Sequence, residues 1–364
     1  MTRDHAEPAP APLTPAVVRF GRLGDMVILT ALLQELHARY GRACLVLAAG
    51  PWNAPLLGSH PDVGCLYDLP RHSPLLLRAV GWQALAALRR AAPGPVYVCE
   101  YQPRQVPRIR RFLRLGGIDP ARCLFIGDQP AAPDEPWIER LVRFGERTPA
   151  AVAAAAYPVP AAGAPWAPRL YTDAADAADV AGWLRERGLS GHPLVLIQAG
   201  NFRTMSRHRE RYQAGSGDDK AWPAAHWTAL IAQILGVDPQ VRVVLCGAPQ
   251  ESALLEELAH HSGRPEVRAA ALPLRRLLAL CAVADSMISI DTGPAHAAAA
   301  CGLPLLVLYG AENPRQWLPR SATGSTVRAL GGPPRVQRVD QLTVAEVFGA
   351  WRTLPARSRL HGAA

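Results

Sequence analysis

The chain alternates short apolar runs with longer stretches whose apolar side chains recur at helical spacing. Residues 16–20 form the first apolar run, and the turn at 21–25 contains two glycines. Apolar positions then recur every three or four residues between Val27 and Leu36, and Gly41 lies where a helix of that length would end. A second apolar run follows at 43–48. The order strand, glycine turn, helix, strand predicts the beginning of a parallel α/β sheet.

The same alternation continues through the rest of the chain. In the first half, two more strands are predicted, with helices between them, at residues 95–99 and 123–126. In the second half, the predicted strands are 194–198, 241–246, 286–290 and 304–309. The predicted helices are 223–235, 250–261, 274–284, 294–301 and, near the end, 343–354. This regular order predicts a second parallel sheet with helices on both faces.

A length of 364 residues exceeds the usual size of one domain, so two domains are expected. Residues 149–168 are rich in Ala and Pro and are typical of a linker. The Pro- and Ala-rich residues 1–15 predict a disordered lead-in. We therefore expect an N-terminal domain at 16–170, a C-terminal domain at 171–335, and a final helix and tail at 336–364.

Three bulk features restrict the class of protein. The sequence has no apolar stretch long enough to predict a membrane span, and its beginning lacks the layout of a signal peptide. The seven cysteines form no Cys-x-x-Cys pair, which disfavours a disulfide framework or a zinc site and favours a reducing cytoplasm. Sequence motifs of metalloproteases, serine hydrolases and Walker-type nucleotide sites are missing, so no metal or cofactor is predicted.

The net charge is +9, from 39 basic and 30 acidic residues. Solubility alone explains such an excess, and an anionic partner explains it equally well. Arginines crowd residues 104–114 and 203–211, and their planar forks suit phosphates and carboxylates. Aromatic side chains that could stack on bases do not alternate with them, which disfavours nucleic acid. Lys220 is the single lysine of the chain.

The turn after the first predicted strand ends in Gly24-Asp25. In an open α/β sheet, ligands bind beyond the carboxyl ends of the strands, where this carboxylate would lie. Asp25 could cap the following helix or act as a general base. The turn lacks the Gly-x-Gly-x-x-Gly pattern of a dinucleotide site.

A second candidate is Asp218-Asp219-Lys220, directly before the helix that Pro223 is expected to begin. An ammonium beside the exposed N–H groups of a helix start can bind phosphate. The alternative is an ordinary helix start whose acids complement the helix dipole.

The third candidate is the run from Asp291 to His296, between a predicted strand and a helix of small residues. Gly293 allows a ligand to approach the backbone, and Pro294 is suited to a first helical turn. Together with the Thr292 hydroxyl, the N–H groups of this turn could bind an anion. An ordinary helix cap by Asp291 or Thr292 is the alternative.

These motifs, in this order, resemble the ADP-heptose:lipopolysaccharide heptosyltransferase family, glycosyltransferase family 9. The resemblance spans about residues 16–320 and comes from five stretches. They are Arg19-Phe20-Gly21-Arg22-Leu23-Gly24-Asp25-Met26-Val27, Asp219-Lys220-Ala221-Trp222-Pro223 with His226-Trp227, Gly247-Ala248-Pro249-Gln250-Glu251, Asp291-Thr292-Gly293-Pro294-Ala295-His296, and Tyr309-Gly310-Ala311-Glu312-Asn313-Pro314 with Trp317.

The resemblance implies a GT-B fold, in which two Rossmann-like domains with parallel sheets face a central cleft. It implies that Asp25 is the catalytic base, Asp291 contacts the donor sugar and Glu251 contacts the nucleoside. The donor diphosphate would be held by Lys220, Thr292, Gly293 and His296. For the acceptor or a phosphate, the candidate contacts are Arg22, Arg108, Arg111, Asn201 and Arg203.

The reaction implied is an inverting, metal-independent transfer of a sugar, with ADP-heptose as co-substrate. The acceptor would be an anionic glycan or glycolipid such as the lipopolysaccharide core. Such an enzyme would be cytoplasmic, with peripheral contact at the inner membrane. Two departures from the family are Ala31, where a proline is common, and the long segment 202–217, which suggests an unusual donor or acceptor.

Other classes remain open on the sequence. A nucleotide-sugar epimerase, or a transferase with another donor, would use a related fold. A Rossmann oxidoreductase is disfavoured by the missing glycine fingerprint. A non-catalytic nucleotide-binding homologue is disfavoured because Asp25, Lys220 and Asp291 occur together.

Overall fold

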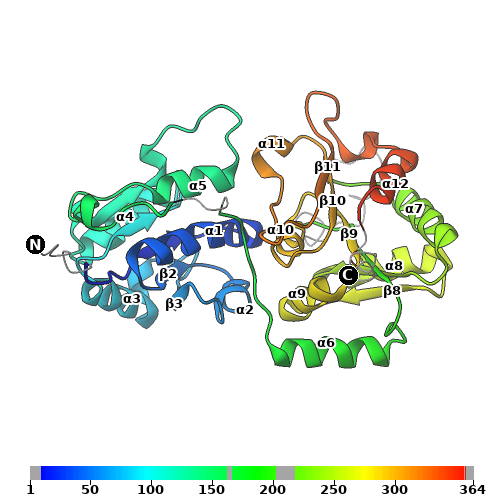
Figure 1. The fold of residues 1–364 in the computed structure, drawn as a ribbon, viewed down its shortest axis with the longest axis horizontal. Helices are drawn as coiled ribbons and strands as arrows, with labels where there is room; N and C mark the ends of the chain where they lie inside the picture. The colour runs from blue at the N-terminus through cyan, green and yellow to red at the C-terminus, as the bar shows by residue number, and fades with distance from the viewer. Residues whose placement is uncertain (1–9, 162–165, 202–217, 356, 358–364) are drawn as a thin grey trace, which may run out of the picture. The chain divides into compact units, whose positions relative to one another are not determined.

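The computed structural model describes residues 10–161, 166–201, 218–355 and 357. The chain divides into two compact units, each built around a parallel sheet (Figure 1). The first unit comprises Met1–Arg22, Leu29–Pro133 and Ile138–Trp166. The second comprises Leu23–Ile28, Asp134–Trp137 and Ala167–Ala364.

The sheet of the first unit has five parallel strands in the order β3-β2-β1-β4-β5. Its strands are β1 Ala16–Arg19, β2 Cys44–Ala48, β3 Val63–Asp68, β4 Val96–Val98 and β5 Cys123–Phe125. The helices of this half are α1 Leu23–Tyr40, α2 Asn53–Leu57, α3 Ala79–Arg90, α4 Val106–Leu115 and α5 Trp137–Gly145.

Helices cover both faces of this sheet. Helices α3 and α4 share one apolar core with Val18 of β1 and Val96 of β4. On the other face, the ring of Phe144 from α5 packs edge-on against Tyr97 of β4, with ring centres 5.5 Å apart. Alternate residues of one strand thus face opposite cores, as the pleat of a strand requires.

The sheet of the second unit has six parallel strands in the order β11-β10-β9-β6-β7-β8. Its strands are β6 Leu194–Gln198, β7 Arg242–Gly247, β8 Val267–Ala271, β9 Ser286–Ile290, β10 Leu305–Tyr309 and β11 Val327–Gly331. The helices are α6 Ala174–Glu186, α7 Ala224–Val237, α8 Ser252–Ser262, α9 Leu274–Val283, α10 Gly293–Ala300, α11 Pro314–Trp317 and α12 Val344–Arg352.

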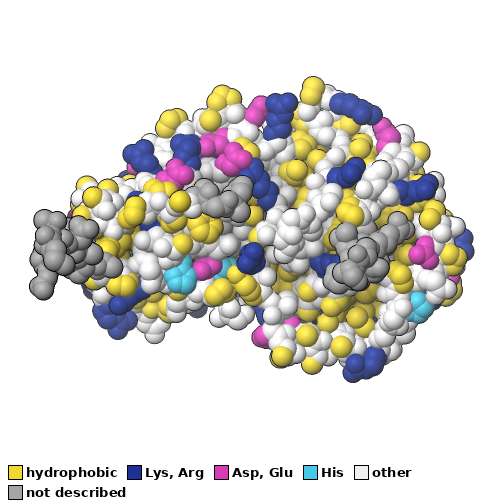
Figure 2. All heavy atoms as spheres, in the orientation of Figure 1, with side chains coloured by type: hydrophobic (Ala, Val, Ile, Leu, Met, Phe, Trp, Pro, Cys, Tyr) yellow, Lys and Arg dark blue, Asp and Glu magenta, His cyan; other side chains and the backbone are white. Residues whose placement is uncertain are grey.

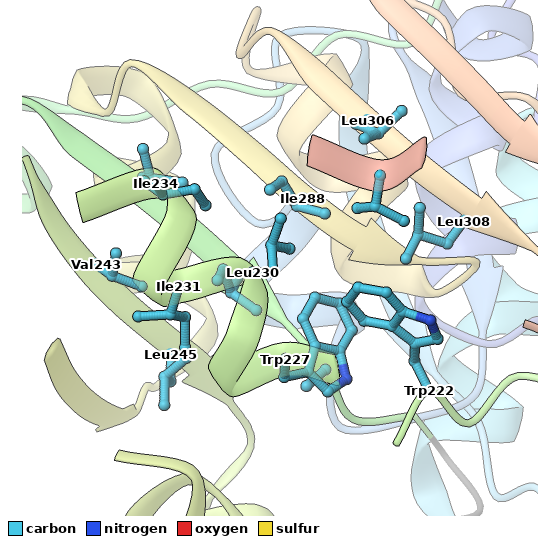
Figure 3. Close-up of a cluster of buried hydrophobic side chains, with 14 of the residues drawn as sticks. Trp222, Trp227, Leu230, Ile231, Ile234, Val243, Leu245, Ile288, Leu306 and Leu308 are labelled. Atoms are coloured by element: carbon cyan, nitrogen blue, oxygen red, sulfur yellow. The ribbon is translucent and has the colours of Figure 1, made fainter. Parts of the chain in front are cut away.

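This sheet is also buried on both faces. Val195 and Ile197 of β6 belong to the core beneath α7, α8 and α12, whereas Leu194 and Leu196 belong to the core beneath α6, α9 and α10. Trp222 and Trp227 are fully buried in the first of these cores, beside Leu306 and Leu308 (Figure 3). Their rings pack edge to face with centres 4.7 Å apart, a favourable geometry for aromatic pairs.

The predicted α/β class with two parallel sheets is confirmed. The sequence patterns missed strands β3, β8 and β11, which all lie at sheet edges. An edge strand needs few buried residues, and Val327–Gly331 has none that is fully buried. Helix α6 was missed as well, because its Ala- and Asp-rich sequence buries only Val180 and Trp183. Among the described helices, none is long and apolar enough to cross a bilayer.

Candidate functional site

The strand order of the second sheet determines where a ligand can bind. Strand β6 lies between β7, the next strand in sequence, and β9, so the direction of winding reverses between β6 and β9. Ligands of doubly wound sheets bind beyond the carboxyl ends of the strands at such a switch point. Gln198 at the end of β6 lies opposite Ser289 of β9, so the loops that follow these two strands start side by side. These loops contain Asn201 and Asp291.

Lys220 lies at this switch point. Its ammonium is 2.5 Å from Asp291 Oδ2 and 3.9 Å from Glu312 Oε1. The Lys220 side chain retains 20% of its exposure, and that of Asp291 retains 12%. The only lysine in the sequence is therefore a partly solvated cation within reach of two carboxylates, one following β9 and one following β10.

The backbone of the Lys220 loop is fixed by buried polar contacts. The buried carboxylate of Asp218 accepts hydrogen bonds from the Lys220 backbone N–H, at 3.1 Å, and from Asn201 Nδ2, at 2.8 Å. The carbonyl of Asp219 accepts a hydrogen bond from the N–H of Val339 at 2.8 Å. A methyl group at Gly310 would lie 2.4 Å from the same carbonyl, so only glycine allows this close approach.

Two tryptophans anchor the loop on the core. The indole N–H of Trp222 donates to the carbonyl of Leu342 at 2.9 Å, and its ring is fully buried against Trp227 (Figure 3). Buried polar groups with a partner specify a unique position, whereas apolar contact alone tolerates small shifts. The Asp-Lys-Ala-Trp-Pro motif therefore holds the Lys220 backbone in a fixed position.

The start of α10 lies beside this cation. Thr292 is the N-cap residue, yet its side chain makes no capping hydrogen bond. Its hydroxyl instead lies 3.2 Å from Ser289 Oγ and 3.3 Å from the carbonyl of Ile290. The ordinary side-chain cap by Thr292 is thus not formed, and the N-terminus of α10 has the polarity that attracts anions. The Ala-rich body of the helix is buried against β9 and β10, which allows the close packing expected from its small residues.

His296 is one turn further along α10 and only 6% exposed. Burial lowers the pKa of its imidazole, and the nearby carboxylates of Asp291 and Asp25 oppose this effect only in part. The ring is therefore neutral at physiological pH and can donate one hydrogen bond without adding charge.

Glu251 follows β7 at the same edge of the sheet. It is 2% exposed, and its Oε2 accepts a hydrogen bond from the Ala248 backbone N–H at 2.9 Å. The contact closes the turn between β7 and α8, so part of the Glu251 carboxylate serves local structure.

Asp25 lies in the first turn of α1, which begins at Leu23. By its contacts, the segment Leu23–Ile28 belongs to the second unit, with Lys220 and Asp291, although the rest of α1 belongs to the first. Asp25 is therefore inside the helix and is not its N-cap residue. Asp25 was a candidate from its place in the sequence, but no local pattern predicts this grouping with Lys220 and Asp291.

A buried ion pair that the sequence did not predict lies at the switch point of the first sheet, between β1 and β4. Glu100 is 1% exposed, and its carboxylate accepts hydrogen bonds from the backbone N–H groups of Phe20, Tyr101 and Gln102 at 3.0 to 3.1 Å. Arg19 lies 3.9 Å from Glu100 and donates to the Cys99 carbonyl at 2.7 Å. In the sequence, this ion pair is indicated only by one acid, Glu100, directly after the strand predicted at 95–99.

The remaining candidates differ in their surroundings. Arg108 donates to the carbonyls of Pro70, Arg71 and Ser73, so its guanidinium holds a loop of its own unit. Arg22 and Arg111 are exposed. Arg203 and the rest of segment 202–217 lie outside the described residues. Among the residues that the structure describes, no three His, Cys, Asp or Glu side chains converge as they would around a metal ion.

Two doubly wound parallel sheets, with a cation and a helix N-terminus beyond the switch point of the second, define the GT-B class of glycosyltransferase folds. The chain superposes on an Escherichia coli structure described as an ADP-heptose lps heptosyltransferase II, with a TM-score of 0.70 and 20% identity. That match covers 97% of this chain and 100% of the other.

Sequence comparisons agree with the fold. Residues 212–343 match the model of glycosyltransferase family 9 (heptosyltransferase). Lipopolysaccharide heptosyltransferase 2 of Salmonella typhimurium is 24% identical over 87% of this chain and 88% of its own length. Lipopolysaccharide heptosyltransferase 1 of Escherichia coli is 34% identical over 28% of this chain. That match spans 31% of the relative, about a third of its length. The match to glycosyltransferase family 9 thus lies in the domain at 212–343.

Proposed function

We propose that the protein transfers a heptose from ADP-heptose to a hydroxyl of a lipopolysaccharide-core acceptor, with inversion at the anomeric carbon. The observation that carries the proposal is the pairing of Lys220 with Asp291 beside the N-terminus of α10, at the switch point of the second sheet. A diphosphate leaving group needs such a cation and such N–H donors. Relatives named as heptosyltransferases, one of them for ADP-heptose, support the choice of donor and acceptor.

The chemistry follows from the charges. As the acceptor oxygen attacks the anomeric carbon, its proton passes to the Asp25 carboxylate, and the bond from that carbon to the diphosphate oxygen breaks. Negative charge then grows on the diphosphate. Lys220 and the backbone N–H of Gly293 stabilise this charge, and the neutral His296 adds a hydrogen bond. These donors supply the stabilisation that a metal ion gives in other transferases, and the transfer is metal-independent.

In this proposal Lys220 exchanges partners during the reaction. Without donor its ammonium is paired with Asp291, and with donor it turns to the diphosphate. Asp291 is then released to accept a hydrogen bond from a sugar hydroxyl. Glu251 contacts the ribose.

The test has two arms. A thermal-shift series with ADP, UDP and GDP should show selective stabilisation by ADP, because ligand binding to the folded state raises the melting temperature. ADP release from ADP-heptose should then fall by at least about a hundredfold in Asp25→Asn, with ADP binding retained. Selective stabilisation by UDP would refute the heptose donor, full activity of Asp25→Asn would refute the base, and ADP binding without turnover of any donor would indicate a non-catalytic homologue.

The acceptor belongs to the glycolipids of the bacterial inner membrane, so we further propose that the enzyme works at the cytoplasmic face of that membrane. The test compares the transfer rate to a water-soluble acceptor without its lipid with the rate to the lipid-linked acceptor in vesicles. Equal rates would argue against a membrane-bound acceptor.

A further inference from the structure

The positive charge of the chain is concentrated in one segment. Residues 69–118 contain nine arginines and a single acid, Glu100. Glu100 is 1% exposed and paired with Arg19, so it contributes nothing to the surface. This segment alone accounts for nearly the whole net charge of +9.

The helices of this segment form one surface of the first unit. Helices α3 and α4 cover the same face of the sheet, and both contribute to the same apolar core. Their ends are close, because Arg89 donates to the carbonyl of Gly116 at 2.7 Å and a methyl group at Gly116 would clash with Leu85. We call the outward side of these helices, with the turn before α3, the α3–α4 surface. It presents Leu77, Arg78, Trp82, Arg111, Arg114 and Leu115.

The apolar residues of this surface are held outward by the fold. In the 3₁₀ helix Leu75–Leu77, Leu75 is buried and anchors the turn, which leaves Leu77 74% exposed. The indole N–H of Trp82 donates to the carbonyl of Leu76 at 2.9 Å, so its ring is fixed while 54% exposed. A methyl group at Gly81 would lie 1.9 Å from the Leu75 carbonyl, so glycine is required for this corner. The polar atom of Trp82 is thus satisfied inside the protein, and its apolar ring faces water.

Isolated exposed leucines are common on soluble proteins and need no explanation. Here Leu77, Trp82 and Leu115, which is 55% exposed, occur among arginines in a segment whose single acid, Glu100, is buried. Hydrophobic and dark blue basic side chains lie next to one another where Figure 1 places α3 (Figure 2). Aromatic and aliphatic side chains flanked by arginines are typical of surfaces that lie in the interface of an anionic bilayer.

Three arginines of the segment are already used, and one of them is Arg89, which donates to the Gly116 carbonyl. Arg108 is bound by backbone carbonyls, and Arg110 pairs with Asp128 at 2.8 Å while stacking over Phe125. Among the exposed arginines that remain in the segment, Arg78, Arg111 and Arg114 belong to the α3–α4 surface.

We propose that the α3–α4 surface docks the protein on an anionic lipid bilayer. Leu77, Trp82 and Leu115 enter the headgroup region, and Arg78, Arg111 and Arg114 pair with lipid phosphates. The proposal concerns where the protein sits and is independent of the sugar that it transfers. Nucleic acid is the less suitable partner, because it would use the arginines but leave the apolar side chains in water.

The experiment is sedimentation of the full chain with vesicles of phosphatidylcholine containing about a third phosphatidylglycerol, compared with phosphatidylcholine alone. Wild type should sediment with the anionic vesicles and remain in solution with the neutral ones. Arg78→Glu should weaken binding about thirtyfold, because it removes one positive charge and adds one negative charge near the surface. The double variant Leu77→Ser and Trp82→Ser should weaken binding at least about tenfold.

Matched controls lie in the second unit. Val237 is 54% exposed and Arg264 is exposed, so Val237→Ser removes an exposed apolar side chain elsewhere and Arg264→Glu makes the same charge reversal elsewhere. Both controls should bind as wild type, and unchanged thermal unfolding verifies that all variants fold. Equal binding to neutral vesicles, or full binding by the Leu77 and Trp82 double variant, would overturn the proposal, and the second result would indicate a purely electrostatic contact such as that with nucleic acid.

Discussion

The ion pair between Lys220 and Asp291 leads to a prediction in which two substitutions have opposite effects on ADP binding. In the free protein the Lys220 ammonium is 2.5 Å from the Asp291 carboxylate. This carboxylate therefore competes with a bound diphosphate for the ammonium. Lys220→Met removes the cation and keeps much of the length of the side chain. Asp291→Asn keeps the cation and removes the competing charge.

The magnitudes follow from the burial of the pair. A hydrogen bond to a charged group contributes about 1.5–3 kcal/mol, which corresponds to a factor of roughly 10 to 150 in a dissociation constant. Lys220→Met should therefore weaken ADP binding by about that factor. Asp291→Asn should leave ADP binding unchanged or strengthen it by up to about tenfold, because Lys220 no longer has to leave a carboxylate.

Isothermal titration calorimetry of ADP with wild type, the two single variants and the double variant measures these changes. The double variant should bind as weakly as Lys220→Met, since Asp291 has no competitive effect without the lysine. Arg264→Met serves as a control for the loss of one exposed cation elsewhere. If Lys220→Met binds ADP as wild type does, or if Asp291→Asn binds as weakly as Lys220→Met, Lys220 does not hold the diphosphate.

Two further predictions concern stability and the loop that carries the lysine. Glu35 is fully buried, neither of its carboxylate oxygens has a hydrogen-bond partner among the described residues, and burial, with help from Glu146 and against Arg39, raises its pKa to about 8. Its folded-state pKa exceeds the unfolded value of 4.5, so its contribution is complete below pH 4.5 and is lost as the pH rises through 8. Denaturant unfolding should show wild type losing up to roughly 5 kcal/mol relative to Glu35→Gln over that range, and equal pH slopes would contradict the assignment. Gly310→Ala should displace the Asp219 carbonyl and raise the KM for the donor about tenfold with a smaller change in kcat, and an unchanged KM would show that the loop tolerates the methyl group.

Much of this protein could be predicted from local sequence. The central strands and the amphipathic helices follow from hydrophobic periodicity, which depends only on neighbouring residues. The turns at Asp25, Lys220 and Asp291 stood out because each joins a predicted strand to a predicted helix or precedes a helix. The local pattern of apolar residues was weaker for the edge strands, which pair with only one neighbouring strand, and for α6, which buries few side chains.

Only the tertiary structure decided which of these turns meet. Lys220 and Asp291 are 71 residues apart in sequence, and they pair because β6 lies next to β9, an order that no local pattern encodes. The same non-local packing gave Gly310 its role beneath the lysine loop, buried the acid of Glu100 and left Trp82 exposed beside arginines. The sequence by itself determined which segments become strands and helices and which residues carry the charge. Strand order and side-chain packing then determined which charges face one another, because those contacts join residues far apart along the chain.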